Sequence, residues 1–282
     1  MNNLKAWLLM GLLTALLVLI GNWIGGTQGA LIFFLIALAM NFFGYYYSDK
    51  IAIAMTGSQP LAEHEAPELY AIIRWLSQRA GIPMPRVYRT PSPQPNAFAT
   101  GRNPANAAVA VTDGLLQLLN RTEIEGVLAH EIAHIKNRDV LVATLAAALA
   151  GAITMVANAL QWGLLFGANR DEEEGQNPLG LIGTLLMIIL APLAATLIQL
   201  AISRTREFQA DATGARLAGS PHGLASALLK LERAAQHIPM QVNPATSHLF
   251  IVNPLSGEFL ASLFSTHPPI AERVRRLQHM QF

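Results

Sequence analysis

The chain of 282 residues contains no cysteine and few charged residues. The absence of cysteine excludes disulfides and thiolate metal sites, so any metal ion must be bound by His, Asp or Glu. Charged residues make up only 13% of the chain, the net charge is +1, and no basic stripe is interleaved with aromatic residues. Nucleic acid is therefore excluded as a partner. Hydrophobic residues make up 52%, a balance typical of a membrane protein.

Several apolar segments are long enough to cross a lipid bilayer, which requires about 20 residues in a helix. The first two, at 4–24 and 30–47, predict a hairpin joined by the uncharged turn GGTQG. A second hairpin is predicted at 140–166 and 179–202, and Pro192 should kink the last span without excluding it. Two alternatives stay open: the first segment is a cleaved signal peptide, or all of these segments are buried helices of a large soluble core.

Lysine and arginine residues near the span ends predict the orientation. They gather on one side of the predicted spans: Lys5, Lys50, Lys136, Arg138, Arg204 and Arg206. The acidic loop at 171–174 lies on the other side, with only Arg170 beside it. Because the positive side is the cytoplasmic one, both termini and both long polar segments are expected in the cytoplasm.

The spans divide the chain into four parts. Residues 1–50 form the first transmembrane hairpin and residues 140–203 form the second. The polar segments 51–139 and 204–282 lie on one side of the membrane and can build one domain together. The predicted fold class is therefore a mainly α-helical membrane protein with four spans and a cytoplasmic α+β domain.

The first polar segment should combine helices with a small sheet. Apolar residues at helical spacing predict a helix over 66–81 that Gly81 ends. The runs PRVYRT, NAFATG and AAVAVT predict three strands with an exposed edge, because neighbouring prolines exclude helix and small residues alternate along them. A short helix should then begin at Thr112 or Asp113.

The motif HEIAH, which begins at His130, lies in the next predicted helix. Residues four apart share a helix face and lie about 6 Å apart along the axis, so His130 and His134 can bind one zinc ion. Glu131, one step round the helix, can then reach the attacking water, as in metalloproteases. Thr122 and Glu125 predict a capping box at the start of this helix, which should continue into the third span. The alternative is a pair of surface histidines.

A catalytic zinc ion needs a third protein ligand beside an open position. Glu207 and Asp211 follow the fourth span, lie four residues apart and share a helix face. Small neighbours, including Gly214, should let this helix approach the HEIAH helix closely. Glu207 is the predicted ligand, and Asp211 is expected to accept a hydrogen bond from the outer nitrogen of a zinc-bound histidine. A solvated helix face is the alternative.

These motifs together resemble a known family. HEIAH, the later REFQAD, the earlier NAFATG and the final THPP stand in the same order around hydrophobic segments in the HtpX family of bacterial membrane-bound zinc endopeptidases, which are gluzincins. The resemblance covers essentially the whole chain. It implies that His130, His134 and Glu207 bind one zinc ion per chain, that Glu131 is the catalytic base, and that the domain has a zincin-type fold. It also implies a place in the bacterial inner membrane and a role in protein quality control and the stress response.

Two weaker motifs each allow two interpretations. In NAFATG, Asn96, Ala97 and Phe98 would bind substrate if an exposed strand accepts a peptide backbone as an added strand. The alternative is a core strand in which Phe98 is buried. His267 in THPP would stabilise the oxyanion that develops during peptide hydrolysis, or it only caps the helix that follows.

The predicted reaction is the hydrolysis of a peptide bond in unfolded or membrane proteins near the bilayer. Glu131 takes a proton from water that the metal has acidified and returns it to the leaving amine. Two other functions stay open. An intramembrane protease is disfavoured because Lys136 and Asp139 directly follow the motif, and a non-enzymatic zinc scaffold is disfavoured because no fourth ligand is evident. The sequence predicts no oligomeric state.

Overall fold

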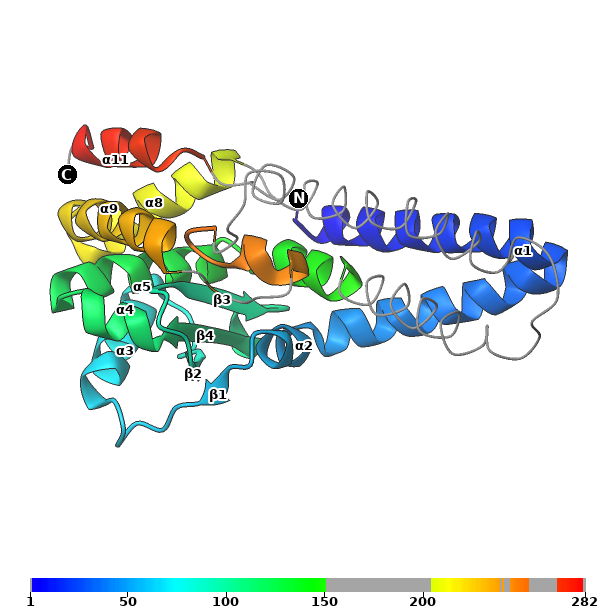
Figure 1. Ribbon diagram of the computed structural model, residues 1–282, viewed down its shortest axis with the longest axis horizontal. Helices are drawn as coiled ribbons and strands as arrows, with labels where there is room; N and C mark the ends of the chain where they lie inside the picture. Colours follow the sequence, from blue (N-terminus) through cyan, green and yellow to red (C-terminus); the bar gives the residue numbers. More distant parts are fainter. Residues whose placement is uncertain (1, 151–203, 239, 241–243, 254–267, 281–282) are drawn as a thin grey trace, which may run out of the picture.

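The computed structural model describes most of the chain: residues 2–150, 204–238, 240, 244–253 and 268–280. These residues form a long helical hairpin attached at one end to an α+β domain (Figure 1). Some predicted features lie outside the described residues: the span 140–166 beyond Ala150, the span 179–202, the acidic loop at 171–174 and His267.

Helix α1 (Asn2–Tyr46) forms the first predicted hairpin. Its two arms, Leu4–Asn22 and Gly25–Tyr46, are each long and apolar enough to cross a membrane. The chain reverses at Gly26, whose φ of 58° lies in the left-handed region that glycine adopts without steric cost. Many large apolar side chains of the arms are exposed, which is costly in water and expected in lipid.

The α+β domain begins directly after the hairpin. Before and between its strands lie two helices and one 3₁₀ turn: α2 (Ser48–Met55), α3 (Pro67–Ala80) and η1 (Pro104–Asn106). After the strands come α4 (Asp113–Leu118) and α5 (Arg121–Lys136). The later described elements are α8 (Arg204–Ala218), α9 (His222–His237), η3 (Pro244–Leu249) and α11 (Ile270–Gln278). The helices predicted over 66–81 and from Asp113 are confirmed, and Gly81 ends α3 in the left-handed conformation.

The small sheet has four strands in the order β1-β2-β4-β3. Their bounds are β1 (Gln59–Pro60), β2 (Arg86–Thr90), β3 (Ala97–Gly101) and β4 (Ala107–Thr112). Strands β2 and β4 are parallel, whereas β1 and β3 each pair antiparallel with their neighbour. The three predicted strands are therefore confirmed, and the motif NAFATG supplies the edge strand β3.

The predicted exposure of β3 is wrong, because the strand is buried along its whole length. Phe98 is fully buried and packs against Phe250, with ring centroids 5.0 Å apart. The pair belongs to a small apolar cluster between the sheet and η3. The core interpretation of Phe98 is thus the correct one.

The outer edge of β3 is covered by later parts of the chain. The carbonyl oxygen of Ala97 accepts a hydrogen bond from the amide of Ile251 at 3.0 Å. At the other end of the strand, the amide of Gly101 donates to Oγ1 of Thr144 at 3.3 Å. Both ends of this edge are already paired, so a substrate strand cannot add along the full edge in this conformation.

The predicted continuation of the HEIAH helix into the third span is also wrong. Helix α5 ends at Lys136, and a separate apolar helix runs over Val140–Ala150. Arg138 takes a left-handed φ of 58°, and the amide of Asp139 donates back to the carbonyl of His134 at 3.0 Å. This hydrogen bond and the left-handed residue define a Schellman turn, which ends a helix and redirects the chain.

The start of α5 differs from the prediction as well. The capping box uses Asn120 and Glu123 instead of Thr122 and Glu125. The Asn120 side chain accepts from the Glu123 amide at 3.0 Å, and Glu123 accepts from the Asn120 amide at 2.9 Å. The helix therefore begins two residues earlier, where asparagine is as good a cap as threonine or better.

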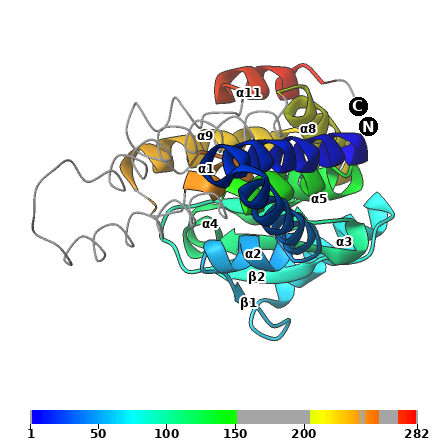
Figure 2. The ribbon, with the colours of Figure 1, turned by 90° about the vertical axis from the view of Figure 1, so that its right-hand side faces the viewer.

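Helix α5 lies at the centre of the domain. The sheet packs on one side of it, and α8, α9 and α11 lie on the other side (Figure 2). The backbones of α5 and α8 come very close, since a Cβ atom at Gly214 would lie only 2.8 Å from the backbone nitrogen of His130. This approach brings the two predicted ligand helices together, as their small residues indicate.

Candidate metal centre

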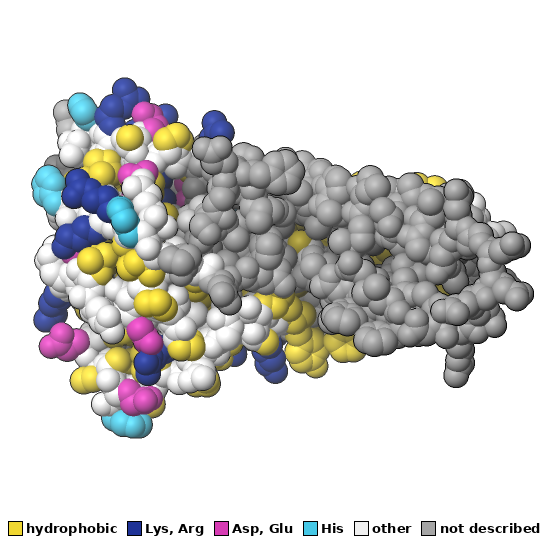
Figure 3. Space-filling view, viewed as in Figure 1, with side chains coloured by type: hydrophobic (Ala, Val, Ile, Leu, Met, Phe, Trp, Pro, Cys, Tyr) yellow, Lys and Arg dark blue, Asp and Glu magenta, His cyan; other side chains and the backbone are white. Residues whose placement is uncertain are grey.

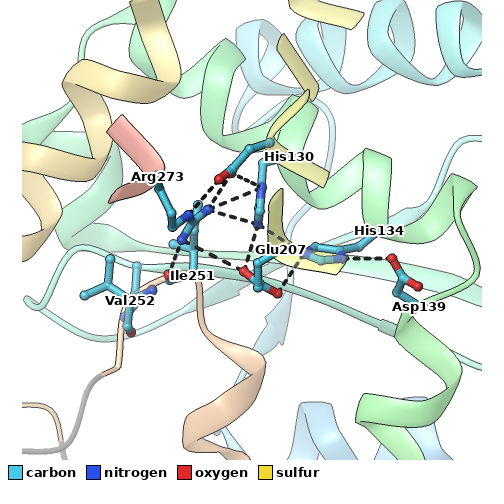
Figure 4. A network of polar contacts seen from close by, with 9 residues as sticks. His130, His134, Asp139, Glu207, Ile251, Val252 and Arg273 are labelled. Carbon is cyan, nitrogen blue, oxygen red and sulfur yellow. Dashed lines mark hydrogen bonds and ion pairs between the residues drawn. The ribbon is translucent and has the colours of Figure 1, made fainter. Parts of the chain in front are cut away.

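Three side chains suited to binding a metal ion converge between α5 and α8. The ligand atoms of His130, His134 and Glu207 lie within 4.8 Å of one another. The two Nε2 atoms are 3.1 Å apart, and the Glu207 carboxylate lies 3.4 Å from Nε2 of His134 and 3.8 Å from Nε2 of His130. Figure 4 shows the three groups pointing toward one another.

These distances fit a single zinc ion. Ligands at about 2.0–2.2 Å from a tetrahedral zinc are separated by about 3.3–3.6 Å. The separations of 3.1, 3.4 and 3.8 Å bracket that range. Two imidazoles and one carboxylate are also ligands that zinc prefers, and they leave a fourth position for water or substrate.

Helix geometry explains the position of each ligand. His130 and His134 are one turn apart on α5, and so they present both rings on one face. Glu207 stands in the first turn of α8, which the contact at Gly214 holds against α5. His130 and Glu207 are buried, while the His134 side chain keeps 15% of its surface exposed. The centre is therefore open chiefly on the His134 side.

The outer nitrogen of each histidine faces a carboxylate. Nδ1 of His130 lies 2.9 Å from Oδ1 of Asp211, and Nδ1 of His134 lies 3.5 Å from Oδ2 of Asp139. A proton held on Nδ1 by such a carboxylate leaves the Nε2 lone pair directed at the metal. Asp211 therefore faces His130. The Schellman turn after α5 brings Asp139 to His134, as Figure 4 shows.

Arg273 of α11 anchors the Asp211 carboxylate. Its side chain is fully buried, and its Nε and Nη2 donate to the two Asp211 oxygens at 2.9 and 2.7 Å. Such a two-point contact fixes both the position and the plane of a carboxylate. Nη1 also donates to the carbonyl oxygen of Ile251 at 3.2 Å, so one side chain joins α11, α8 and the segment that covers β3.

Known proteins resemble this chain over most of its length. The sequence profile described as Peptidase family M48 matches residues 63–281. This chain belongs to peptidase family M48. A curated relative called "Protease HtpX homolog" from Pelotomaculum thermopropionicum (strain DSM 13744 / JCM 10971 / SI) is 68% identical over 280 residues, which are 99% of each chain. Another protein of that description, from Pyrococcus abyssi (strain GE5 / Orsay), is 56% identical over 98% of this chain and 94% of its own length.

Among solved structures, this M48 peptidase is similar to one titled "Crystal Structure of S. mikatae Ste24p". The TM-score is 0.46 and the identity is 22%, and the match covers 95% of this chain and 62% of the other. The relatives in sequence confirm the predicted resemblance to the HtpX family. The chain is thus an HtpX-like protease of family M48, and its apolar hairpin together with these relatives indicates a membrane protein.

The charges around the metal centre of this M48 peptidase are unbalanced. Burial lowers the pKa of His130 to about 4, although Asp211 opposes that effect. Burial acts in the same direction on His134, but Glu207 and Asp139 outweigh it and raise its pKa to about 10. Burial would raise the pKa of Asp211, yet Arg273 and His130 hold that pKa at about 2. Among the described residues that contact the two histidines, the carboxylates of Asp139, Glu207 and Asp211 outnumber the one guanidinium, that of Arg273, and a divalent cation would neutralise part of that surplus.

The remaining predicted site residues have different positions. Glu131 is buried on α5 between the two histidines. Asn96 is also buried, and its side chain pairs with the backbone of Val252, donating at 2.8 Å and accepting at 3.3 Å. The side-chain amide of Asn96 thus holds the segment beside β3 much as a backbone group would. The substrate-binding role of Asn96 and Ala97 stays a prediction.

The sequence motifs do not reveal two residues of the centre, Asp139 and Arg273. The sequence places Asp139 only at the membrane boundary, because the turn that brings it to His134 has arginine instead of glycine at its left-handed position. The position of Arg273 in the sequence indicates its role more clearly. It stands on α11 directly before Val274, in the stripe of inward-facing residues, and a charged side chain within an apolar stripe indicates a buried partner.

Proposed function

We propose that this protease is a zinc-dependent endopeptidase at the cytoplasmic face of a bacterial inner membrane, acting on membrane or misfolded proteins. The observation that supports it best is the set formed by His130, His134 and Glu207, which offers three zinc ligands and one open position. Membership of peptidase family M48 supports the reaction type. The stress-response and quality-control role rests on the resemblance to the HtpX family alone.

The chemistry follows from the positions of the side chains. Zinc bound by His130, His134 and Glu207 would supply a Lewis acid that polarises the scissile carbonyl and lowers the pKa of water. Glu131 takes a proton from the attacking water as its oxygen bonds to the carbonyl carbon. When the carbon–nitrogen bond breaks, Glu131 returns that proton to the leaving amine. Water is consumed, and one amine and one carboxylic acid are released.

The neighbouring groups keep the ligands in the required state. Asp211 and Asp139 face the outer nitrogens of His130 and His134, which favours the tautomer that presents Nε2 to a metal ion. Arg273 keeps Asp211 ionised and correctly oriented. These contacts come from groups of the protein itself, and such fixed positioning of the ligands is the preorganisation that a catalytic site needs.

The connection between α5 and the hairpin supports action near the bilayer. Three residues separate the end of α5 from the helix Val140–Ala150. Leu145 and Leu149 of that helix share one buried apolar cluster with Leu13 of the hairpin. The metal centre is therefore attached to the apolar arms through a short, packed connection, and substrates with segments close to the membrane would reach it most easily.

Cleavage of casein by the purified full-length protein in detergent tests the proposal. Cleavage should stop when a zinc chelator is added and should return when zinc is restored. Glu131→Gln should keep the fold and bind zinc normally, but it should slow cleavage by about 10²–10⁴-fold because it removes the base and no ligand. Glu125→Gln on the same helix is the matched control and should leave the rate unchanged.

Two outcomes would contradict the proposal. Appreciable cleavage by Glu131→Gln would show that another group is the base. Full zinc binding without any cleavage by the wild-type protein would favour a zinc-binding scaffold instead.

A further inference from the structure

A cavity of about 280 Å³ opens where the second arm of the hairpin joins the α+β domain. Most of its wall is aromatic or basic and comes from four separate segments: Phe42, Tyr46, Tyr47, Lys50, Arg86 and Arg102. Figure 3 shows hydrophobic side chains gathered beside a basic one in this region. The cavity has no part in the metal centre described above.

The aromatic side chains beside the cavity are of the kind that gathers at the depth of the lipid headgroups. Phe42, Phe43, Tyr46 and Tyr47 stand at the end of the arm Gly25–Tyr46 and keep between 43% and 55% of their surface exposed. Aromatic residues gather at both interfaces of a membrane, where one part of the ring is apolar and the other is hydrated. If the arm spans the bilayer, these rings mark its boundary.

The basic side chains give the cavity a surplus of positive charge. Arg86 forms an ion pair with the buried Asp49, which neutralises one of three cations. Lys50 and Arg102 have no carboxylate partner among the residues that the structure describes. The Lys50 Nζ lies 5.2 Å from the ring centre of Tyr47. The positive charges of Lys50 and Arg102 can therefore bind an anion from outside the protein.

Arg102 is already held in position to bind an anion. Its Nη1 donates to the carbonyl oxygen of Tyr46 at 2.8 Å, and its guanidinium lies 5.4 Å from the centre of the Tyr46 ring. These contacts fix the side chain and leave other N–H groups of the fork available. A fixed guanidinium binds phosphate oxygens at a small entropic cost.

We propose that this cavity binds the phosphate headgroup of an anionic phospholipid. Lys50 and Arg102 would contact the phosphate, and the exposed faces of Phe42 and Tyr46 would pack against the first part of the acyl chains. Basic pockets beside transmembrane helices on the cytoplasmic side suit such headgroups. A lipid fits better than a free anion because the same cavity presents apolar rings at membrane depth.

Lipid binding here would set the position of the protease domain relative to the membrane. Arg86 begins β2 and Arg102 directly follows β3, so one basic residue lies in the sheet that packs on α5 and another lies at the end of its edge strand. A headgroup bound between α2 and the sheet would fasten that sheet to the bilayer surface. The proposal does not depend on peptidase activity.

Native mass spectrometry of the full-length protein in detergent tests this proposal. The protein is offered phosphatidylglycerol or phosphatidylcholine with the same acyl chains. We expect one retained phosphatidylglycerol per chain and a preference over phosphatidylcholine of about thirtyfold, as two basic side chains at an anionic surface would give. The double variant Lys50→Gln and Arg102→Gln should lose most of this preference.

Two matched variants separate the cavity from general charge and from misfolding. Arg74→Gln with Arg79→Gln removes two exposed arginines from α3 and should keep the preference for phosphatidylglycerol. Lys50→Arg with Arg102→Lys keeps both charges and should retain at least part of the preference. Thermal unfolding of each variant without added lipid checks that the fold is intact.

Other results would overturn the proposal. Equal retention of the two lipids would show only nonspecific contact with the hairpin. An unchanged preference in the Lys50 and Arg102 double variant would place the lipid elsewhere. Displacement of the lipid by millimolar inorganic phosphate would show that the cavity binds free phosphate rather than a membrane lipid.

Discussion

The metal centre and the outer edge of β3 are both lined by buried polar groups, yet they differ in how those groups are satisfied. At the edge of β3, the Asn96 side chain and the Ala97 carbonyl pair with backbone groups of the same chain. At the metal centre, Glu207 faces two imidazoles, and among the described residues the carboxylates of Asp139, Glu207 and Asp211 meet the one guanidinium of Arg273. A buried region whose own charges do not balance is suited to a ligand, whereas a balanced one is suited to holding the fold together.

The largest effect in this comparison is expected from Glu207→Gln. A neutral amide is a poorer oxygen ligand than a carboxylate, so the variant should lose both bound zinc and peptidase activity. Glu232→Gln on α9 makes the same chemical change away from the centre and should keep both. Zinc content and casein cleavage are measured on the purified proteins. Near-normal activity of Glu207→Gln would mean that another acid completes the site.

Arg273→Met should destabilise the protein strongly. The change leaves the buried Asp211 carboxylate without its two hydrogen bonds, and breaking a buried ion pair from one side typically costs about 3–5 kcal/mol. Zinc should also bind more weakly, because Asp211 no longer holds His130 in position. Arg273→Lys keeps the charge but not the two-point contact, so its stability should lie between that of the wild type and that of Arg273→Met. Chemical denaturation together with zinc titration measures both effects.

Phe98→Ala tests the difference between the edge of β3 and the metal centre. It should lower the stability of the fold without changing the rate of peptide cleavage. Phe98 is fully buried against Phe250, and removing such a phenylalanine typically costs about 3–5 kcal/mol. The folded fraction should still cleave casein at close to the normal rate. Loss of activity at unchanged thermal stability would instead restore the substrate-binding role of Phe98.

Asp139→Asn should have a smaller effect than the same change at Asp211. The Asp139 carboxylate lies 3.5 Å from His134, which is long for a hydrogen bond. Losing a group that hydrogen-bonds to a metal ligand typically weakens metal binding by about 10–100-fold. We expect the loss of zinc affinity to lie near the lower end of this range for Asp139→Asn and near the upper end for Asp211→Asn. Zinc titration of the two variants against a competing chelator gives the ratio. An equal loss in both would contradict the geometric argument.

The smallest effect is expected from Glu123→Gln, far from the metal. Burial raises the pKa of Glu123, but hydrogen bonds from Lys230 and Ser226 outweigh it and lower the pKa. The ionised Glu123 side chain therefore stabilises the folded protein at pH values above the pKa that Glu123 has in the unfolded chain. This stabilisation is lost as the pH falls through the lower pKa of Glu123 in the folded protein. Wild type should be more stable than the variant at pH 7 by about 1–3 kcal/mol, and the difference should shrink in acid. A difference that stays constant with pH would contradict this role.

The parts of the centre that follow from local spacing could be predicted from the sequence. The helical period places His130 and His134 on one face, and the same argument pairs Glu207 with Asp211. Small residues such as Gly214 also indicate the close contact of the two helices. These predictions need only the geometry of one helix and the ligand preferences of zinc.

The wrong predictions depend on contacts between distant segments. The edge of β3 is covered by Ile251 and Val252, and nothing in the motif NAFATG indicates that a later segment would lie there. The sequence predicts a continuous helix into the third span because no glycine or proline marks an end. Arg138 nevertheless takes the left-handed conformation, which the sequence does not indicate because residues other than glycine rarely adopt it.

X-ray absorption at the zinc edge of the purified wild-type protein, together with its zinc content, tests the central claim most directly. The account predicts one zinc ion per chain, bound by two imidazole nitrogens and by carboxylate oxygen at about 2.0–2.2 Å. In Glu207→Gln the carboxylate contribution should disappear together with most of the zinc. A protein that cleaves casein with no bound zinc, or a zinc ion whose surroundings are unchanged in Glu207→Gln, would contradict the account.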